Sequence, residues 1–210
     1  MDSAAVSGAG FRGVLHYPHK PNGCALALTH GAGSDCHAPL LTEVACACAE
    51  AGLLVLRYDL PFRQQRPKGP PSPAAAARDR EGVVRAVEML RGRVPGQAIA
   101  GGHSYGGRQT AMAMSENPGL ADALLLLSYP LHPPNHPEKP RTAFFPAWRT
   151  PALFVHGTHD PFGTLDEMRA ALRQIPARVE LLPVEGAGHD LKCASLAGAI
   201  AERLRALVLF

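Results

Sequence analysis

Residues 101–110 read GGHSYGGRQT and place one serine, Ser104, among four glycines. The five residues from Gly102 to Gly106 fit the pattern G-x-S-x-G, which is typical of a sharp turn from a strand into a helix with the serine at its apex. Glycines are needed on both sides because the apex residue adopts an unfavourable backbone conformation and the strand and helix approach closely. In a chain with 21 glycines the pattern also arises by chance, so its meaning depends on the surrounding sequence.

The composition indicates one globular domain. The 210 residues are 46% hydrophobic, which is enough to bury one substantial core. We expect this domain to span residues 11–210 and residues 1–10 to be disordered. The 21 lysines and arginines are spread along the chain, which argues against a nucleic-acid partner.

The cysteines and the N-terminus predict a cytoplasmic protein. Five cysteines form an odd set without a C-x-x-C pair, which argues against a disulfide scaffold and a structural metal site and favours a reducing compartment. The first residues, MDSAAVSGAGFRG, lack the basic and apolar regions of a secretion signal. No apolar run reaches the ~18 residues of a membrane span, so we expect no membrane partner.

Short apolar runs alternate with segments of helical period, a pattern that predicts an α/β fold with a mostly parallel sheet and helices on both faces. The expected buried strands are 24–30, 53–59, 97–103, 123–129, 152–157 and 179–185, with an edge strand at 11–18. The expected helices are 38–51, 74–91, 105–116, 164–175 and 194–208.

Two proline-rich stretches, residues 60–73 and 130–148, interrupt this alternation and are expected to be irregular. Both follow strands, so they emerge at the carboxyl edge of the sheet, where ligands bind in open α/β folds. Only residues 130–151 separate two of the expected strands, too few for a helical cap domain. We therefore expect an open pocket.

A serine hydroxyl needs a histidine to accept its proton and an acidic residue to orient that histidine. After a G-x-S-x-G turn the acid and then the histidine are expected in loops that leave later strands. Asp160 follows the strand 152–157 within THDPF, and His189 follows the strand 179–185 within GAGHDL. The sequence thus predicts a catalytic triad of Ser104, Asp160 and His189.

Acyl transfer also needs two backbone N–H donors for the oxyanion of the tetrahedral intermediate. The residue after the nucleophile, Tyr105, supplies one. The glycine-rich stretch THGAG (29–33) closes an early strand, and we expect the Ala32 amide to supply the other.

The motifs HGAG, GHSYGG, HGTHD and GAGHD, in this order and spacing, resemble those of the α/β-hydrolase superfamily over nearly the whole chain. The small size without a cap and the stretch LLLLSYPLHPP (124–134) resemble dienelactone-hydrolase-like proteins, and more closely the testis-expressed hydrolase-like family and its bacterial relatives. The resemblance implies Ser104 as nucleophile, Asp160 as acid and His189 as base. Dienelactone hydrolases proper carry a cysteine at the position of Ser104, so their lactone chemistry is not implied.

Other acids and the histidines offer competing interpretations. Asp166 falls within an expected helix and Asp190 adjoins the histidine, so Asp160 is favoured as the acid. Ten histidines suggest a metal site, for example at LHPPNHP, but no third ligand with suitable spacing stands out. We expect no metal and no cofactor.

Two further side chains at the carboxyl edge are candidates for substrate binding. Arg63 lies in the first proline-rich stretch and could meet an acidic group, although such loop charges are usually solvated. Tyr129 ends the strand 123–129 and could line the pocket. Asp59, which ends the strand 53–59, is expected to brace loops.

The sequence therefore predicts a serine hydrolase that cleaves an ester or related acyl bond of a small substrate through an acyl-enzyme intermediate. Peptidase or thioesterase activity on the same triad stays open, because specificity is set in the loops. A hydrolase-like scaffold that binds a partner protein is a third hypothesis, and an intact triad argues against it. The oligomeric state is left open.

Overall fold

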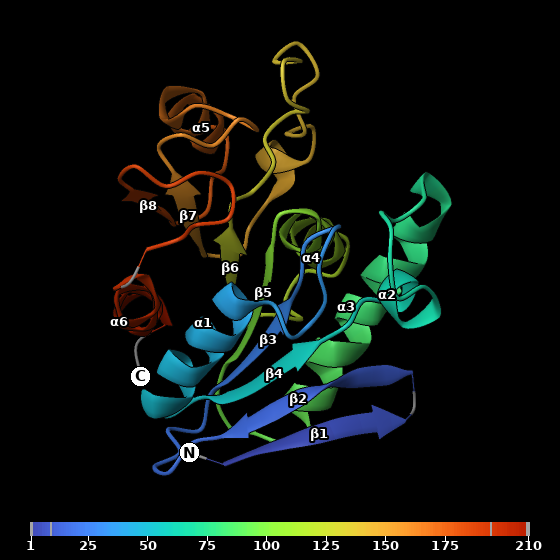
Figure 1. The fold of residues 1–210 in the computed structure, drawn as a ribbon. Coiled ribbons are helices and arrows are strands. Elements are labelled where there is room, and N and C mark those ends of the chain that lie inside the picture. The colour runs from blue at the N-terminus through green and yellow to red at the C-terminus, as the bar shows by residue number, and fades with distance from the viewer. Residues whose placement is uncertain (1, 9, 194, 209–210) are drawn as a thin grey trace.

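The computed structural model describes residues 2–8, 10–193 and 195–208. They form an eight-stranded sheet with helices on both faces (Figure 1), which confirms the predicted α/β fold. The strands are β1 (Asp2–Gly8), β2 (Phe11–Tyr17), β3 (Ala25–Thr29), β4 (Leu54–Tyr58), β5 (Ala98–His103), β6 (Ala123–Leu127), β7 (Ala152–Gly157) and β8 (Val179–Val184). The helices are α1 (Pro39–Glu50), α2 (Pro61–Gln65), α3 (Ala76–Arg91), α4 (Tyr105–Glu116), α5 (Leu165–Leu172) and α6 (Leu196–Val208), with two 3-10 turns at Pro73–Ala75 and Phe145–Ala147.

The strand order is β1-β2-β4-β3-β5-β6-β7-β8. The β1–β2 and β2–β4 pairs are antiparallel, and every other pair is parallel. The central strands β3 and β6 are buried at every position, as expected for apolar strands covered on both faces. Because parallel strands end at the same edge, the loops after β3, β5, β7 and β8 meet there.

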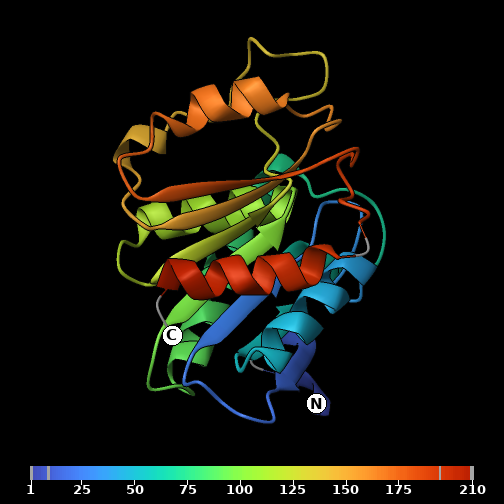
Figure 2. The ribbon, with the colours of Figure 1, turned by 90° about the vertical axis from the view of Figure 1, so that its left-hand side faces the viewer.

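Two hydrophobic clusters cover the opposite faces of the sheet. One cluster joins α1 to α6 through residues such as Val44 and Ile200, and Figure 2 shows these two helices together on one face. The other cluster joins α3, α4 and α5 through residues such as Val83, Ala111 and Met168. Successive residues of β5 alternate between the two clusters, since side chains of a strand point to alternate faces.

Residues 2–8 correct the expectation of disorder over 1–10, of which residues 1 and 9 lie outside the described residues. Asp2–Gly8 form strand β1, which pairs with β2 in an antiparallel hairpin, so β1 and not the predicted segment 11–18 is the edge strand. The side chains of β1 are almost all exposed, so its sequence has no hydrophobic pattern. Backbone hydrogen bonding to β2, which needs no apolar side chain, explains why this strand forms.

The proline-rich stretch 60–73 also contains a regular element. Helix α2 begins at Pro61, where proline is favoured because the first helical N–H has no partner within the helix. The segment between β6 and β7 holds only a three-residue 3-10 turn. No cap domain is therefore inserted there, and the carboxyl edge of the sheet is not covered by one.

Candidate active site

Ser104 lies at the apex of the turn between β5 and α4, as the sequence predicts. Its backbone has φ 51° and ψ −117°, a conformation that is strained for a residue with a side chain. The Ser104 N–H donates to the Leu127 carbonyl at 2.8 Å and so ties the turn to β6. A Cβ on Gly102 would lie 2.7 Å from the backbone of Gly106 and Gly107, so strand and helix can meet only where the side chain is absent.

The side chains of Ser104, His189 and Asp160 lie in a row at the carboxyl edge of the sheet. His189 Nε2 is 2.7 Å from Ser104 Oγ, and His189 Nδ1 is 2.8 Å and 3.0 Å from the two carboxylate oxygens of Asp160. The Asp160 side chain is fully buried, whereas 22% of the His189 side chain is exposed. The carboxylate accepts the Nδ1 proton of His189, which leaves the Nε2 lone pair free to accept the hydroxyl proton of the serine.

The two competing acids face other groups. Asp166 pairs with Arg169 on α5, and Asp190 pairs with Lys192 in the segment after His189. Asp160 is therefore the acid that the structure brings to the histidine.

A second histidine, His156 on β7, lies beside the Asp160 carboxylate and was not predicted. Its Nε2 donates to the Gly163 carbonyl at 2.7 Å, so the loop that carries Asp160 is tied back to β7. Its buried Nδ1 is 3.8 Å from Asp160 Oδ2 and makes no hydrogen bond among the described residues. The Phe162 N–H donates to Asp160 Oδ1 at 2.9 Å, which fixes the carboxylate from the other end of the loop.

Two aromatic neighbours hold the His189 ring and its backbone. The Phe162 ring lies 4.2 Å from the His189 ring, centroid to centroid, at an interplanar angle of 31°. His103 Nε2 donates to the His189 carbonyl at 2.8 Å. Burial lowers the pKa of His103, so it is neutral at physiological pH. A structural hydrogen-bonding role for His103, next to the predicted nucleophile, agrees with sequence reasoning, whereas the ring contact of Phe162, two residues after Asp160, was missed.

The glycine-rich loop after β3 reaches Ser104. A Cβ on Gly31 would lie 3.4 Å from Ser104 Cβ and 3.0 Å from His103 Nδ1, so this loop packs directly against the serine. Tyr105 is the first residue of α4, and Ala32 follows Gly31 in the loop. The two residues expected to supply oxyanion donors therefore belong to segments that meet at Ser104, and their amide roles stay predictions.

Arg63 corrects the sequence prediction, because it braces this loop instead of facing a substrate. Its side chain is buried. It donates to the carbonyls of Ala32 and Ser34 at 2.8 Å each, and to those of Arg66 and Gly69 at 3.1 Å each. All these donors point at backbone carbonyls, so the guanidinium stabilises the backbone of the loop after β3.

Asp59 is bound to the same loop, in agreement with its expected bracing role. Its buried carboxylate accepts the Cys36 N–H at 2.8 Å and Arg12 Nε at 2.6 Å. His30 Nε2 accepts the Leu60 N–H at 3.1 Å, and burial lowers the pKa of this histidine. These contacts connect β3, β4 and β2 beneath the site.

Tyr105 reaches away from the nucleophile towards α3. Its hydroxyl donates to Asp79 Oδ2 at 2.7 Å, and Asp79 Oδ1 accepts the Phe62 N–H at 3.0 Å. Burial raises the pKa of Asp79. The tyrosine side chain thus anchors the start of α4, while its backbone amide lies at the nucleophile turn.

Tyr129 corrects the second prediction of a substrate contact. It is buried in an aromatic cluster with Phe145 and Phe154, with ring centroids 5.6 Å and 5.9 Å away. Its hydroxyl donates to the Arg141 carbonyl at 2.6 Å. Tyr129 therefore supports the segment between β6 and β7 from within the core.

Two further findings concern ligands and membranes. Within residues 2–8, 10–193 and 195–208, no group of three or more His, Cys, Asp or Glu side chains is placed to hold a metal ion. Across those same ranges, none of the helices has the length and apolar character needed to span a membrane.

Solved structures with the same fold cover nearly the whole chain. A dienelactone hydrolase from Anabaena variabilis is 21% identical with a TM-score of 0.75, over 99% of this chain and 97% of that chain. Est1E from Butyrivibrio proteoclasticus is 16% identical with a TM-score of 0.77, over 100% of both chains. A serine hydrolase without a lid from Xanthomonas campestris is 17% identical with a TM-score of 0.72, over 99% of this chain and 96% of that chain.

At these identities the structural neighbours establish the fold. A family model described as an alpha/beta hydrolase domain matches residues 22–207. This match includes the loop after β3, the serine turn and the loops that carry Asp160 and His189. The chain therefore belongs to the alpha/beta hydrolase family.

Proposed function

We propose that this hydrolase cleaves carboxylic esters by a serine mechanism with Ser104, His189 and Asp160 as its catalytic triad. The observation that carries the proposal is the unbroken row of contacts from Ser104 Oγ through the His189 ring to the Asp160 carboxylate. The order of contacts matches the roles of nucleophile, base and orienting acid. The strained backbone of Ser104 supports the same role, because strain of this kind is concentrated at functional sites.

In the first half of the reaction, His189 Nε2 takes the hydroxyl proton while Ser104 Oγ forms a bond to the ester carbonyl carbon. The tetrahedral intermediate collapses when the bond to the leaving oxygen breaks and His189 gives that oxygen its proton. The products are a free alcohol and an acyl group esterified to Ser104. Asp160 stays ionised and stabilises the imidazolium that forms in between.

In the second half, His189 takes a proton from a water molecule, whose oxygen attacks the acyl carbon. Collapse of the second tetrahedral intermediate returns the proton to Ser104 Oγ and releases the carboxylic acid. The amides of Tyr105 and Ala32 would donate to the oxyanion of both intermediates. Such donors typically contribute a factor of roughly 10²–10³ each to kcat.

Several findings support the assignment of this hydrolase as a serine esterase. The neighbour Est1E has been solved with ferulic acid bound, and the neighbour from Xanthomonas campestris is a serine hydrolase without a lid. We also infer a position near the dienelactone-hydrolase-like proteins and the testis-expressed hydrolase-like family, from the motifs quoted above. All five cysteines are free, which supports our proposal of a cytoplasmic location.

A fluorophosphonate probe tests the proposal directly, because it reacts only where serine, histidine and oxyanion donors act together. The wild-type protein should take up one label, located on Ser104 by peptide mass spectrometry, and should hydrolyse p-nitrophenyl acetate. Ser104→Ala should abolish both signals. Ser115→Ala, the same change at a half-buried position near the end of α4, should keep both.

Two outcomes would contradict the serine mechanism. One is a folded wild-type protein that takes up no label. The other is ester hydrolysis that survives Ser104→Ala. The unfolding temperature of each variant, measured in parallel, separates loss of the nucleophile from loss of the fold.

A further inference from the structure

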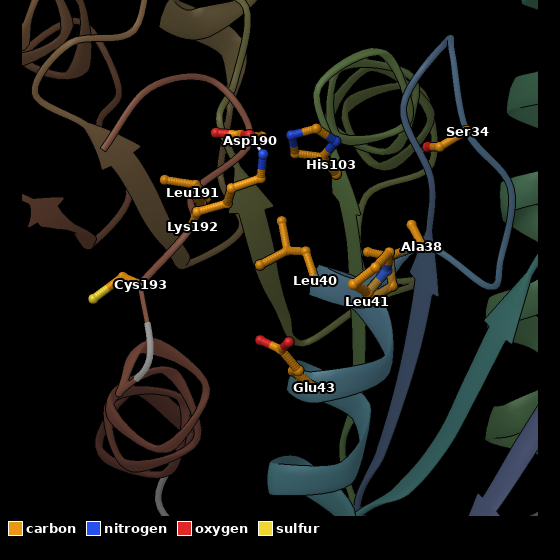
Figure 3. Close-up of a pocket in the computed structure, with 11 residues that line it drawn as sticks. Ser34, Ala38, Leu40, Leu41, Glu43, His103, Asp190, Leu191, Lys192 and Cys193 are labelled. Carbon is orange, nitrogen blue, oxygen red and sulfur yellow. Dashed lines mark ion pairs between the residues drawn. The ribbon is translucent and has the colours of Figure 1, made fainter. Parts of the chain in front are cut away.

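A cavity of about 380 Å³ lies beside the serine turn, between the beginning of α1 and the segment 190–193 that follows His189 (Figure 3). Leu40 and Leu41 line it from α1, and Leu191 lines it from the opposite segment. The volume lies within the range of small-molecule pockets, and apolar side chains dominate the lining. The cavity is thus suited to an apolar group of a small ligand.

His103 connects the wall of the cavity to the proposed active site, because it lines the cavity and its Nε2 donates to the His189 carbonyl. His103 ends β5 and directly precedes Ser104, and its ring lines the cavity between Asp190 and the loop that carries Ser34 (Figure 3). Its position on β5 has the same parity as Ile99, which belongs to the α1 and α6 cluster. His103 therefore points to the face of the sheet that carries α1, and the cavity extends along that face.

The position of the cavity relative to the triad decides which part of an ester it would receive. Tyr105, whose amide is the expected oxyanion donor, packs towards the α3 and α4 cluster on the opposite face. The cavity is lined instead by the residues that directly follow His189. Because His189 must hand its proton to the leaving oxygen, that oxygen lies against the histidine, and its substituent extends on the cavity side.

The charged groups at the cavity favour an uncharged occupant. Glu43 and Asp190 contribute carboxylates, and Lys192 contributes the one ammonium group among the lining residues. Lys192 is paired with Asp190 at 2.8 Å, and both side chains are largely exposed. An anionic ligand group would meet the exposed Glu43 carboxylate beside an apolar wall, which disfavours its binding.

We propose that this cavity binds the alcohol portion of the ester substrate, as an uncharged alkyl chain that lies between Leu40 and Leu191. The inference rests on the serine esterase function proposed above and adds the substrate class. The free enzyme would then select esters by the length of the alkoxy group more than by the length of the acyl group.

Two isomeric esters test this selectivity with the same atoms. Hexyl acetate carries its long chain on the alcohol side, and ethyl hexanoate carries it on the acyl side. We expect kcat/KM, measured by acid release in a pH-stat, to be about tenfold higher for hexyl acetate, because each buried methylene adds binding energy. Leu40→Trp fills the cavity. It should lower the ratio of kcat/KM for hexyl acetate to kcat/KM for ethyl hexanoate about tenfold, to a value near one.

The matched control is Leu181→Trp. Leu181 is also half-buried and lines a separate cavity of about 400 Å³ between α5 and β8, so this variant should keep the wild-type ratio. Leu40→Phe provides a smaller filling change if the tryptophan variant does not fold. Modification of Cys193, an exposed thiol at the cavity, with N-ethylmaleimide should shift the ratio in the same direction, and Cys193→Ser should be insensitive to the reagent.

The outcomes separate this inference from the proposed function. If Ser104 takes up the fluorophosphonate but Leu40→Trp leaves the ratio unchanged, the cavity assignment is wrong and the serine mechanism stands. A loss confined to ethyl hexanoate would overturn the assignment to the alcohol side. If wild-type Ser104 takes up no label, it is the serine mechanism that fails.

Discussion

The loop after β3 and the loop after β8 meet at Ser104, yet they are held in place by different forces. Buried charged side chains hold the first loop. Arg63 donates to its carbonyls, Asp59 accepts the Cys36 N–H, and Arg57 donates to the Cys36 carbonyl. Apart from the Asp160–His189 contact, the loop after β8 is held by the neutral rings of His103 and Phe162, and its ion pair between Asp190 and Lys192 is exposed.

This difference predicts that the loop after β3 is rigid and that the loop after β8 can adjust. The expected oxyanion donor on the first loop must keep a fixed position, because preorganised dipoles stabilise charge without reorganising during the reaction. Buried hydrogen bonds to charged groups are strong enough to provide that rigidity. The second loop carries His189, the proposed base, and one wall of the proposed substrate cavity, and weaker contacts leave this wall able to adjust.

The largest effect is expected at the point where the two loops meet. His189→Ala removes the proposed base and should lower kcat/KM for p-nitrophenyl acetate by about 10⁴-fold, because proton transfer and attack act as one unit. The free energy of unfolding should also fall, by about 1–3 kcal/mol, because the buried Asp160 carboxylate loses this hydrogen-bond donor. The measurement is steady-state hydrolysis, with the exposed His136→Ala as the matched control.

A fall of less than tenfold in His189→Ala would show that another group accepts the serine proton. His103 is the nearest alternative, and its hydrogen bond to the His189 carbonyl would then have to be broken.

The second prediction breaks the charged brace of the loop after β3. Arg63→Ala leaves four carbonyls without this donor, including those of the half-buried Ala32 and Ser34, so the free energy of unfolding should fall by about 3 kcal/mol. The activity of the folded fraction should fall by about 10²-fold, as for loss of one oxyanion donor. Urea unfolding and ester hydrolysis below the unfolding transition measure the two effects.

Arg63→Lys distinguishes charge from geometry. A lysine ammonium keeps the charge but cannot reproduce the planar set of donors. This variant should therefore recover less than half of the lost stability. Full recovery would mean that the charge alone holds the loop.

The outcomes for individual residues show how far sequence reasoning reaches. The order of the motifs predicted that Ser104, Asp160 and His189 lie at one edge of the sheet. This was possible because the hydrophobic pattern indicates where each strand ends and which loop follows it. The two predicted substrate contacts, Arg63 and Tyr129, are turned inward instead. Whether a loop side chain faces solvent or the core depends on packing partners far along the chain, and a local sequence pattern does not contain them.

The same limit applies to the fold. Strand β1 could not be predicted, since its exposed side chains leave no apolar period and its partner is the β2 backbone. The contact of the Phe162 ring with His189 had a weak sequence signal, because Phe162 lies two positions after Asp160 at the expected edge of the sheet. The sequence does show that His103 and Ile99 point to the same face of strand β5. Which helices cover that face is known only from the structure.

The third prediction concerns pH and the brace beneath the first loop. His16 accepts a hydrogen bond from Arg57 Nε at 2.9 Å, and Arg57 Nη1 holds the Cys36 carbonyl. Burial, with a contribution from the Arg57 charge, lowers the pKa of His16 from 6.5 to about 4. Between these values the unfolded chain binds a proton that the folded chain does not, so the free energy of unfolding decreases as pH falls.

At pH 5 this contribution is about 2 kcal/mol relative to pH 8, from a difference of roughly 1.4 kcal/mol per pH unit. His16→Gln keeps an acceptor for Arg57 but does not titrate. Its stability, measured by urea unfolding at pH 8 and pH 5, should therefore decrease less on acidification than that of the wild-type protein. A residual decrease is expected from His30 and His103, whose pKa values are also lowered by burial. Equal decreases in both proteins would exclude His16 as a source of acid sensitivity.

The smallest effect on activity is expected from Phe162, whose neutral ring packs on the loop after β8. Phe162→Ala removes the ring that packs on His189 and should lower kcat about tenfold while KM changes less than about twofold, because a positioning residue acts on the histidine and not on the bound ester. Phe162→Tyr retains the ring and should restore kcat. Phe144→Ala, at a half-buried ring stacked on Trp148, is the matched control and should keep kcat. A rise in KM at constant kcat would instead indicate that Phe162 contacts the substrate. The Phe162 ring would then contribute to substrate binding, as proposed for the cavity beside His103.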